Sequence, residues 1–264
     1  MIFNKNQVLN KEVPDKILGI YYLKDNLNNI IYIGKSINIK KRLIQHLNNG
    51  RKRLISSFTY LTIKKLNTEL EALLLESQEI KKHKPIYNRQ LRRYKEKYSI
   101  FKKKNKDGYP IYYLGPKQSN SLIDFMSKKQ AYNFLIKVNN KFNLCEKLNG
   151  IDKVNKYCFK YNLKICNGAC IKKEPLKKYE KRFYDSLSRL FRFPKNCAIT
   201  FKYNNFITKV TILNNQVIEF SVLGKSKHKI NFSSFDEMKI VNSYKKKFPE
   251  RLLKIKITNK FDIR

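Results

Sequence analysis

The chain has 264 residues, 42% of them hydrophobic, and its 58 lysines and arginines against 20 acidic residues give a formal net charge of +38. This length and apolar share are typical of one large domain or two to three small ones, and they call for neither disorder nor a disulfide scaffold. So strong a positive field attracts polyanions, and 17 tyrosines and 17 phenylalanines supply rings that can stack on bases. Nucleic acid is the expected partner, although a composition biased toward Lys, Asn and Ile accounts for the charge about equally well.

The N-terminal stretch MIFNKNQVLNKEVPDKI lacks the apolar core of a signal peptide, and Glu12 and Asp15 are untypical of an organellar presequence. No window approaches the ~20 apolar residues of a membrane span. We therefore expect a soluble cytoplasmic monomer with no membrane partner. In a reducing compartment the five cysteines are not expected to form structural disulfides.

The first segment, residues 15–95, is expected to run strand, strand, helix, strand, helix. GIYYL and IIYIG flank the polar loop 24–29 and predict an antiparallel hairpin. The sequence then predicts a helix over 39–47, a strand in FTYLTIKKL and a helix over 68–83 that ends before Pro85.

The second segment, residues 96–192, opens with the hairpin sequence YSIFKKKNKDGYPIYYLG, followed by helices over 128–142 and 175–191 that flank four cysteines. The third segment, residues 193–264, alternates apolar and polar residues in CAITFKYNNFITKVTILNNQVIEFSVL, which predicts a β-meander. A helix over 235–248 and the strand LLKIKI follow. The predicted fold class is α+β, and the role of the small C-terminal α+β module stays open.

Two similar triplets, GIY at 19–21 and YIG at 32–34, lie on the two strands of the first hairpin. If they pair isoleucine to isoleucine and tyrosine to tyrosine, Tyr21 and Tyr32 lie on one face and the isoleucines on the other. Gly34 then ends the second strand and allows a tight turn after it. Taken alone, the triplets are also ordinary hairpin sequence.

Two helices add polar residues that a core would not need. Arg42 and His46 lie one turn apart on the same side of the helix over 39–47, a pair that is also common on helix surfaces. In the helix over 68–83, Glu76 falls inside the apolar arc made by the leucines. A carboxylate there needs a cation or hydrogen bonds, and a metal ion and a buried arginine are equal alternatives. The opposite, polar side of this helix is expected to carry Glu71, Gln78 and Glu79.

Together these features resemble the GIY-YIG nuclease family, and within it the excinuclease UvrC and its single-nuclease relative Cho. The matching positions are, in chain order, the two triplets, Lys35, Asn38, Lys41-Arg42-Leu43, Glu71 to Glu76, Ile80 to Pro85, and Tyr87-Asn88. The resemblance implies a small three-stranded antiparallel sheet flanked by helices, and a metal-dependent endonuclease that leaves a 5′-phosphate and a 3′-hydroxyl.

The resemblance also implies a role for each matching residue. Glu76 would be the single protein ligand of Mg²⁺ or Mn²⁺, and Arg42 would stabilise charge on the scissile phosphate. Tyr21 or Tyr32 would orient or deprotonate the attacking water, and members of the family differ over which. Because an unperturbed tyrosine is a poor base at neutral pH, Lys35 or Arg42 is expected to lower its pKa. The site would be completed by Lys35, His46 and Asn88.

Four cysteines form a second group with the spacing C-x12-C-x7-C-x3-C: Cys145, Cys158, Cys166 and Cys170. Thiolates bind soft metals, and the spacing alone does not separate zinc from an iron–sulfur cluster; simple burial is the less favoured alternative. UvrC has four cysteines in the same arrangement after its nuclease domain, which implies a [4Fe-4S] cluster here, with Zn²⁺ as the alternative. Cys197 lies outside the pattern and is expected to be buried.

We therefore interpret the chain as a UvrC/Cho-type endonuclease that incises double-stranded DNA near a lesion in nucleotide excision repair, with UvrB and UvrA as potential partners. The alternatives are a non-catalytic nucleic-acid-binding protein with a degenerate GIY-YIG fold, and a GIY-YIG nuclease acting on branched DNA or RNA. The resemblance ends near residue 190, before the UvrB-binding segment and second nuclease half of UvrC. Candidate phosphate contacts follow the last matching position: Arg89, Arg92, Arg93 and Lys95.

Overall fold

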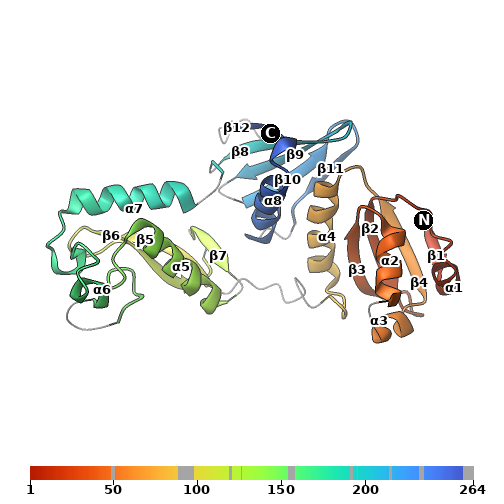
Figure 1. Ribbon diagram of the computed structural model, residues 1–264, viewed down its shortest axis with the longest axis horizontal. Coiled ribbons are helices and arrows are strands. Elements are labelled where there is room, and N and C mark those ends of the chain that lie inside the picture. Colours follow the sequence, from red (N-terminus) through yellow and green to blue (C-terminus); the bar gives the residue numbers. More distant parts are fainter. Residues whose placement is uncertain are drawn as a thin grey trace. The chain divides into compact units, whose positions relative to one another are not determined.

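The computed structural model describes residues 1–48, 51–88, 98–118, 121–125, 127–153, 158–190, 193–194, 196–213, 216–231 and 235–257. Contacts divide the chain into two compact units (Figure 1). The first unit combines residues 1–94 with residues 194–264, so the C-terminal module belongs with the N-terminal segment. The second unit comprises residues 95–193.

The N-terminal part of the first unit is built on a four-stranded antiparallel sheet. Its order is β1-β4-β2-β3, with β2 in the centre beside β4 and β3 at the edge. The resemblance implied three strands, and the fourth, β1, is added by the N-terminal residues pairing with β4. The strands are β1 (Ile2–Asn4), β2 (Gly19–Lys24), β3 (Ile30–Ser36) and β4 (Tyr60–Lys65).

The register of the β2–β3 hairpin differs from the sequence-based prediction by two residues. Tyr21 pairs with Gly34, and Tyr32 pairs with Leu23. A shift of two preserves the faces of both strands, so Tyr21 and Tyr32 still share one face. Gly34 lies inside β3, which continues to Ser36, and does not end the strand as predicted. Its role is steric, because a Cβ at this position would lie 2.6 Å from the Tyr21 ring.

Helices cover both faces of this sheet. The face that carries Tyr21 packs with α2 and α3 around a core that also includes Leu43, Leu54 and Phe58. The opposite face packs against α4, where the Tyr22 hydroxyl donates to Glu79. The helices of this part are α1 (Lys5–Leu9), α2 (Ile39–Asn48), α3 (Lys52–Ser57) and α4 (Glu69–His83).

Helix α4 begins and ends where the sequence predicts. The Thr68 side chain accepts from the Glu71 amide, and Lys84 ends the helix in the left-handed conformation, one residue before Pro85. The prediction of a polar side on this helix is largely wrong, because Glu71 is fully buried and Gln78 is only 8% exposed. The C-terminal module covers that side and supplies hydrogen-bonding partners, which a single-helix pattern does not contain.

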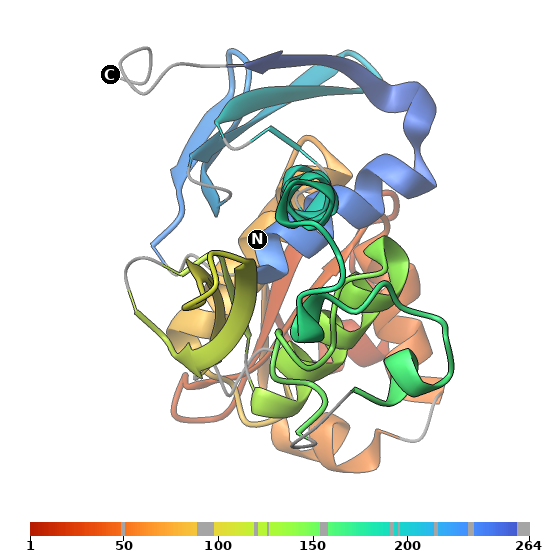
Figure 2. The same cartoon turned by 90° about the vertical axis from the view of Figure 1, so that its left-hand side faces the viewer.

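The C-terminal module is a five-stranded antiparallel meander with one helix, α8, which packs against α4 and β10 (Figures 1 and 2). The strand order is β11-β10-β9-β8-β12, so the last strand returns to pair with the first of the module. Its elements are β8 (Cys197–Tyr203), β9 (Phe206–Leu213), β10 (Gln216–Val222), β11 (Ser226–Lys229), α8 (Phe235–Lys247), a 3-10 turn (Pro249–Arg251) and β12 (Leu252–Ile257).

The second unit contains a three-stranded antiparallel sheet and two long helices. The predicted hairpin is formed by β5 and β6, with Gly108 at a positive φ of 83° in the turn. Its core includes Tyr112, Tyr179 and Phe183, all of which are fully buried. The elements are β5 (Tyr98–Lys104), β6 (Pro110–Pro116), β7 (Ile123–Phe125), α5 (Lys128–Phe142), α6 (Phe159–Asn162), a 3-10 turn (Ala169–Ile171) and α7 (Leu176–Leu190).

The predicted α+β class is thus confirmed, with a cysteine-containing helical segment and a β-rich C-terminal module. Among the residues described, no helix combines the length and the apolar character needed to cross a membrane.

Candidate functional site

The two tyrosines of the triplets lie together in the core beneath α2. Tyr21 is fully buried and Tyr32 is 7% exposed, and their ring centroids are 6.0 Å apart. The closeness depends on Gly34, since any larger residue there would displace the Tyr21 ring. The Arg51 guanidinium lies 5.3 Å from the centroid of the Tyr32 ring, a cation–π contact that the sequence analysis missed.

His46 on α2 is the hydrogen-bonding partner of Tyr21. The Tyr21 Oη and His46 Nε2 atoms are 2.7 Å apart, and the His46 ring packs edge-on against Tyr32 at 5.3 Å. Burial and the positive charges of Arg51 and Arg42 lower the pKa of His46 to about 4. A neutral imidazole can present Nε2 as an acceptor, so the Tyr21 hydroxyl donates to it.

The pKa of Tyr21 is raised well above the ordinary tyrosine value. Burial is the largest cause, followed by the neighbouring Tyr32, and the opposing charge of Arg42 is too weak to offset them. The predicted net lowering of the tyrosine pKa is therefore wrong for Tyr21, where Arg42 acts in the predicted direction but is outweighed by burial and Tyr32. Composition and spacing could not reveal this because burial depends on how the whole face of the sheet is covered.

Glu76 on α4 reaches the edge strand β3, where its Oε1 accepts the backbone N–H of Lys35 at 3.0 Å. Burial raises the pKa of Glu76 to about 7, against the lowering effects of this hydrogen bond and of the charges on Lys35 and Arg42. Glu76 is half-buried against β3, which agrees with its predicted place on the apolar side of the helix. The role assigned to it, metal ligation, stays a prediction.

Arg42 carries the positive charge common to this cluster. Its positive charge opposes the raised pKa values of Tyr21 and Glu76 and contributes to the lowered pKa of His46, so one cation acts on all three groups. The side chain is half-exposed and donates through Nη1 to Gln45 at 3.1 Å. A guanidinium placed this way can receive a phosphate from the solvent side.

Lys35 and Asn88 shape the edge of the sheet. The Lys35 ammonium donates to Glu69 at 3.0 Å. The Asn88 side chain forms two hydrogen bonds with the backbone of Ile33 on the outer edge of β3. Its Oδ1 accepts from the Ile33 N–H at 2.9 Å, and its Nδ2 donates to the Ile33 carbonyl at 2.7 Å. Sequence analysis missed Glu69, although it lies seven residues before Glu76 and so on the same helix face.

The four-cysteine group is assembled at the end of the second unit. The sulfur atoms of Cys145, Cys158 and Cys170 all lie within 4.8 Å of one another, and the Cys166 sulfur is 3.7 Å from that of Cys158. Burial raises the pKa of Cys145 to about 11 and that of Cys158 to about 12. A metal ion would reverse this shift and bind thiolates. Cys197 is buried outside this group, as expected.

The predicted phosphate contacts lie outside the described residues: Arg89, Arg92, Arg93 and Lys95. Their placement therefore stays a prediction. The structure does bring together Tyr21, Tyr32, Arg42, His46, Glu76 and Lys35 from β2, β3, α2 and α4.

Two family models match adjacent parts of the chain. Residues 18–89 match the UvrC-like GIY-YIG domain, and residues 86–189 match the middle domain of the UvrC/Cho excinucleases. The crystal structure of the magnesium-bound GIY-YIG N-terminal endonuclease domain of UvrC from Thermotoga maritima is 30% identical. That match covers 32% of this chain and 93% of that domain, with a TM-score of 0.29.

Curated relatives extend the match. UvrABC system protein C of Mycoplasmoides gallisepticum is 34% identical over 186 residues, which are 64% of this chain and 29% of that protein. The Clostridium botulinum protein of the same name is 27% identical over 259 residues, which cover 89% of this chain and 41% of that protein. The chain thus spans less than half the length of these relatives.

The match to the Clostridium botulinum protein covers 89% of this chain, which is more than residues 1–192 contain. The likeness therefore extends into the C-terminal module, beyond the predicted end near residue 190. The two domain models cover the residues of the candidate site and the four cysteines. Through these two domains, the chain belongs to the UvrC-like family of GIY-YIG proteins.

Proposed function

We propose that the chain is a divalent-metal-dependent endonuclease that hydrolyses a phosphodiester beside a lesion in double-stranded DNA, in cytoplasmic nucleotide excision repair. The observation that carries the proposal is the convergence of a half-buried carboxylate, a shared guanidinium and a tyrosine–histidine pair at one edge of the sheet. This set contains a metal ligand, a phosphate-binding cation and a proton acceptor, which are the groups that phosphodiester hydrolysis needs.

Glu76 suits a divalent cation. Burial disfavours the ionised carboxylate and raises its pKa to about 7, and a bound cation would offset that effect. Oε1 accepts from Lys35, while Oε2 has no hydrogen-bonding partner in the part of the chain that is described. Glu76 would therefore hold Mg²⁺ or Mn²⁺, which when bound supplies Lewis-acid charge beside the leaving oxygen.

Tyr21 and His46 form the proton-accepting pair in this proposal. Because its pKa is raised, Tyr21 keeps its proton at neutral pH unless the proton has an acceptor. His46 supplies one at 2.7 Å, and the negative charge of a bound phosphate would offset the cations that lower the pKa of His46. Tyr21 would orient the attacking water, while Tyr32 supports the His46 ring. Arg42 would stabilise the charge that develops on the phosphate.

The test is Mg²⁺-dependent cleavage of an end-labelled duplex that carries a single lesion and preloaded UvrA and UvrB. The wild type is compared with Glu76→Gln and with Glu79→Gln, which removes a carboxylate from the same helix but on the side of Tyr22. We expect one discrete cut beside the lesion with the wild type and the control, and none with Glu76→Gln.

Binding without cutting by all three proteins would reject the endonuclease proposal and favour the non-catalytic alternative. Cutting of a branched duplex or RNA, but not of the lesion duplex, would keep the nuclease and reject the repair role. Retained cutting by Glu76→Gln would reject Glu76 as the metal ligand.

We also propose that the four cysteines hold a [4Fe-4S] cluster, with Zn²⁺ as the alternative. Convergence of all four sulfurs supports a metal centre. A Zn–S bond of about 2.3 Å places two ligands of a tetrahedron roughly 3.8 Å apart, so the 3.7 Å between Cys158 and Cys166 fits the zinc alternative as it stands. The cluster is supported by the resemblance of the cysteine arrangement to that of UvrC. Iron, sulfide and zinc content of anaerobically purified protein decides between them: four irons with four sulfides support the cluster, and one zinc rejects it.

For the domain organisation we propose a nuclease domain at 15–95, a hairpin and cysteine-cluster domain at 96–192, and a C-terminal module at 193–264. The family likeness supports UvrB and UvrA as partners. Arg89, Arg92, Arg93 and Lys95 are proposed to contact DNA phosphates, and the chain is proposed to act as a monomer.

A further inference from the structure

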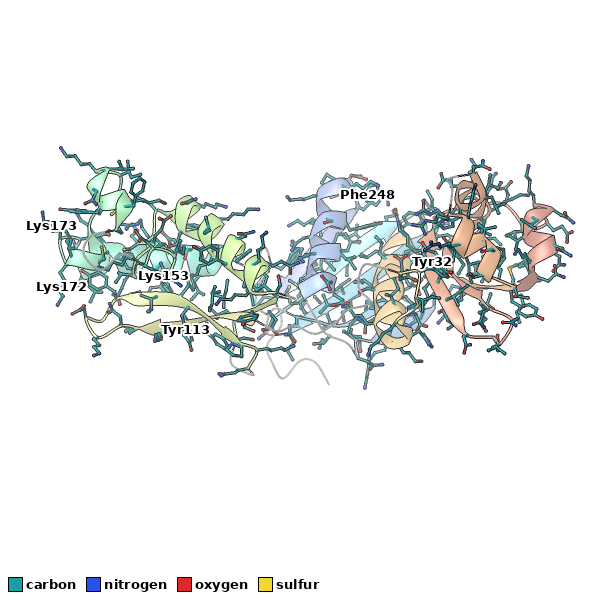
Figure 3. All side chains as sticks on the ribbon, turned by 90° about the horizontal axis from the view of Figure 1, so that it is seen from below. Tyr32, Tyr113, Lys153, Lys172, Lys173 and Phe248 are labelled. Carbon is teal, nitrogen blue, oxygen red and sulfur yellow. The ribbon has the colours of Figure 1, made fainter. Side chains whose placement is uncertain are left out.

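A pocket with a volume of about 310 Å³ lies between α4 and α8, inside the first unit. From the nuclease domain it is lined by Lys35, Glu69 and Leu73. From the C-terminal module it is lined by α8 and by Phe248, which is labelled with Tyr32 in Figure 3. Neither the sequence analysis nor the proposed endonuclease mechanism uses these C-terminal residues.

The pocket adjoins the candidate active site through a single residue. Lys35 lines the pocket, and its backbone N–H donates to Glu76, the expected metal ligand. Its ammonium pairs with Glu69 at 3.0 Å, and Arg251 approaches the same carboxylate at 3.8 Å. Glu69, the acidic residue among the described residues of the lining, is therefore already paired with cations.

The C-terminal side of the pocket combines cations with an aromatic ring. Lys239, Ser243 and Lys247 are four residues apart, so they form one line along α8, and all three are exposed. Lys239 also lies 3.5 Å from Asp236. The Phe248 ring is half-buried, with the Arg251 guanidinium 3.7 Å from its centroid and the Lys247 ammonium 5.0 Å away. Rings beside lysines are typical of surfaces that bind single-stranded nucleic acid.

We propose that this pocket accepts one unstacked nucleotide of the strand that is cut, with its base against Phe248 and its phosphate between Lys239 and Lys247. The volume lies at the low end for small-molecule sites, which suits one nucleotide and excludes a duplex. The lining is mostly apolar, which suits a base, and the exposed lysines Lys239 and Lys247 on α8 favour a partner that carries negative charge. The proposal rests on the proposed endonuclease function and assigns the C-terminal module a part in recognising the substrate.

The binding test uses fluorescence anisotropy in EDTA, so that no cleavage occurs. Three labelled duplexes are compared: one fully paired, one with a single unpaired nucleotide, and one with an abasic residue at the unpaired position. We expect the wild type to bind the unpaired nucleotide at least about fivefold more tightly than either of the others, because one stacked base contributes that much or more.

Matched variants locate the effect. Lys239→Ala/Lys247→Ala should abolish the preference and reduce the slope of log Kd against log salt by about 1, because one phosphate is no longer neutralised. Lys202→Ala/Lys209→Ala removes the same charge from exposed positions on β8 and β9 and should leave the preference intact. Phe248→Leu should lose the preference, and Phe248→Tyr, which retains a ring, should keep it.

Equal binding of the three duplexes by the wild type, or equal effects of the two lysine pairs, would overturn the proposal. Loss of the preference in Phe248→Tyr as well as in Phe248→Leu would also reject a stacked base. The endonuclease proposal is judged separately by Glu76-dependent cleavage. If the wild type cuts DNA but does not prefer the unpaired nucleotide, only the pocket proposal fails. If it prefers the unpaired nucleotide but does not cut, only the endonuclease proposal fails.

Discussion

We expect a single carboxyl group, that of Glu76, to link folding stability to pH and to metal binding. Its pKa is about 7 in the folded protein against an ordinary 4.5, so between these pH values the folded state binds more protons than the unfolded one. Without metal, the contribution of Glu76 to stability is therefore largest below pH 4.5 and falls as the pH rises toward 7. Burial is the cause, because the ionised carboxylate loses its water.

Glu76→Gln should therefore become more stable relative to the wild type as the pH rises in EDTA. Between pH 4.5 and 8 we expect a relative change on the order of 3 kcal/mol in the free energy of unfolding, measured by urea titration. His46 also titrates here, with a pKa lowered to about 4, but it is present in both proteins and cancels from the difference. Mg²⁺ at pH 8 should stabilise only the wild type. A pH-independent difference between the two proteins would contradict this account.

The Tyr21 hydroxyl offers a second test at the level of one atom. Tyr21→Phe leaves the His46 Nε2 without its 2.7 Å partner in a buried site. Cleavage should fall by about 10²-fold or more, since a positioned proton-transfer group contributes at least that much. Tyr22→Phe is the control, because Tyr22 lies on the other face of β2 and donates to Glu79. Single-turnover rates on the lesion duplex measure both, and equal rates would remove Tyr21 from the proposed mechanism.

At the scale of elements, β3 depends on the absence of a side chain at Gly34. Gly34→Ala would place a methyl group 2.6 Å from the Tyr21 ring. We expect a loss of about 1–3 kcal/mol in the free energy of unfolding, together with loss of cleavage, because the ring and its hydroxyl must move. Gly115→Ala on β6 is a milder control, since its Cβ would lie 3.2 Å from the Phe101 ring. Denaturant midpoints and cleavage rates measured together would show whether stability and activity fall in parallel.

The elements themselves were largely predictable from the sequence. Local signals were sufficient for the hairpin β2–β3, for α4 between Thr68 and Lys84, and for the C-terminal meander. The register of β2 against β3 was not predictable, because the alternation of apolar and polar residues fixes only the face of a strand. A shift of two residues leaves that alternation unchanged. Short elements such as β1, α3 and β7 were missed because three to six residues carry too little periodicity.

The candidate site was predicted as a set of residues but not in its electrostatics. Helical position marked Glu76, and the family resemblance added Arg42 and His46; the structure brings all three to Tyr21. The direction of the Tyr21 pKa shift was missed, since burial by α2 is a tertiary property. Glu71 was misplaced for the same reason: its partners Ser226 and His228 come from a module more than 150 residues away in the chain.

At the scale of the whole molecule, α4 connects the nuclease domain to the C-terminal module through buried polar contacts. The Lys81 ammonium donates to Glu237 on α8 at 2.5 Å, and both side chains are fully buried. Ser77 and Gln78 donate to the same carboxylate oxygen. Glu76, the proposed metal ligand, and Lys81 thus lie five residues apart on α4, so we expect docking of the module to help position Glu76.

Lys81→Met should therefore destabilise the first unit by about 3–5 kcal/mol, because it leaves Glu237 buried without its cation. Adding Glu237→Gln should recover much of that loss, since a neutral amide can still meet Ser77 and Gln78 while no charge is stranded. Urea unfolding of the single and double variants gives the coupling free energy between the two positions. A large positive coupling, with one cooperative transition for the first unit, would show that the C-terminal module and the nuclease domain fold together. Additive effects would mean that α8 only rests on α4, and the C-terminal module would then contribute charge and aromatic contacts to DNA without stabilising the site.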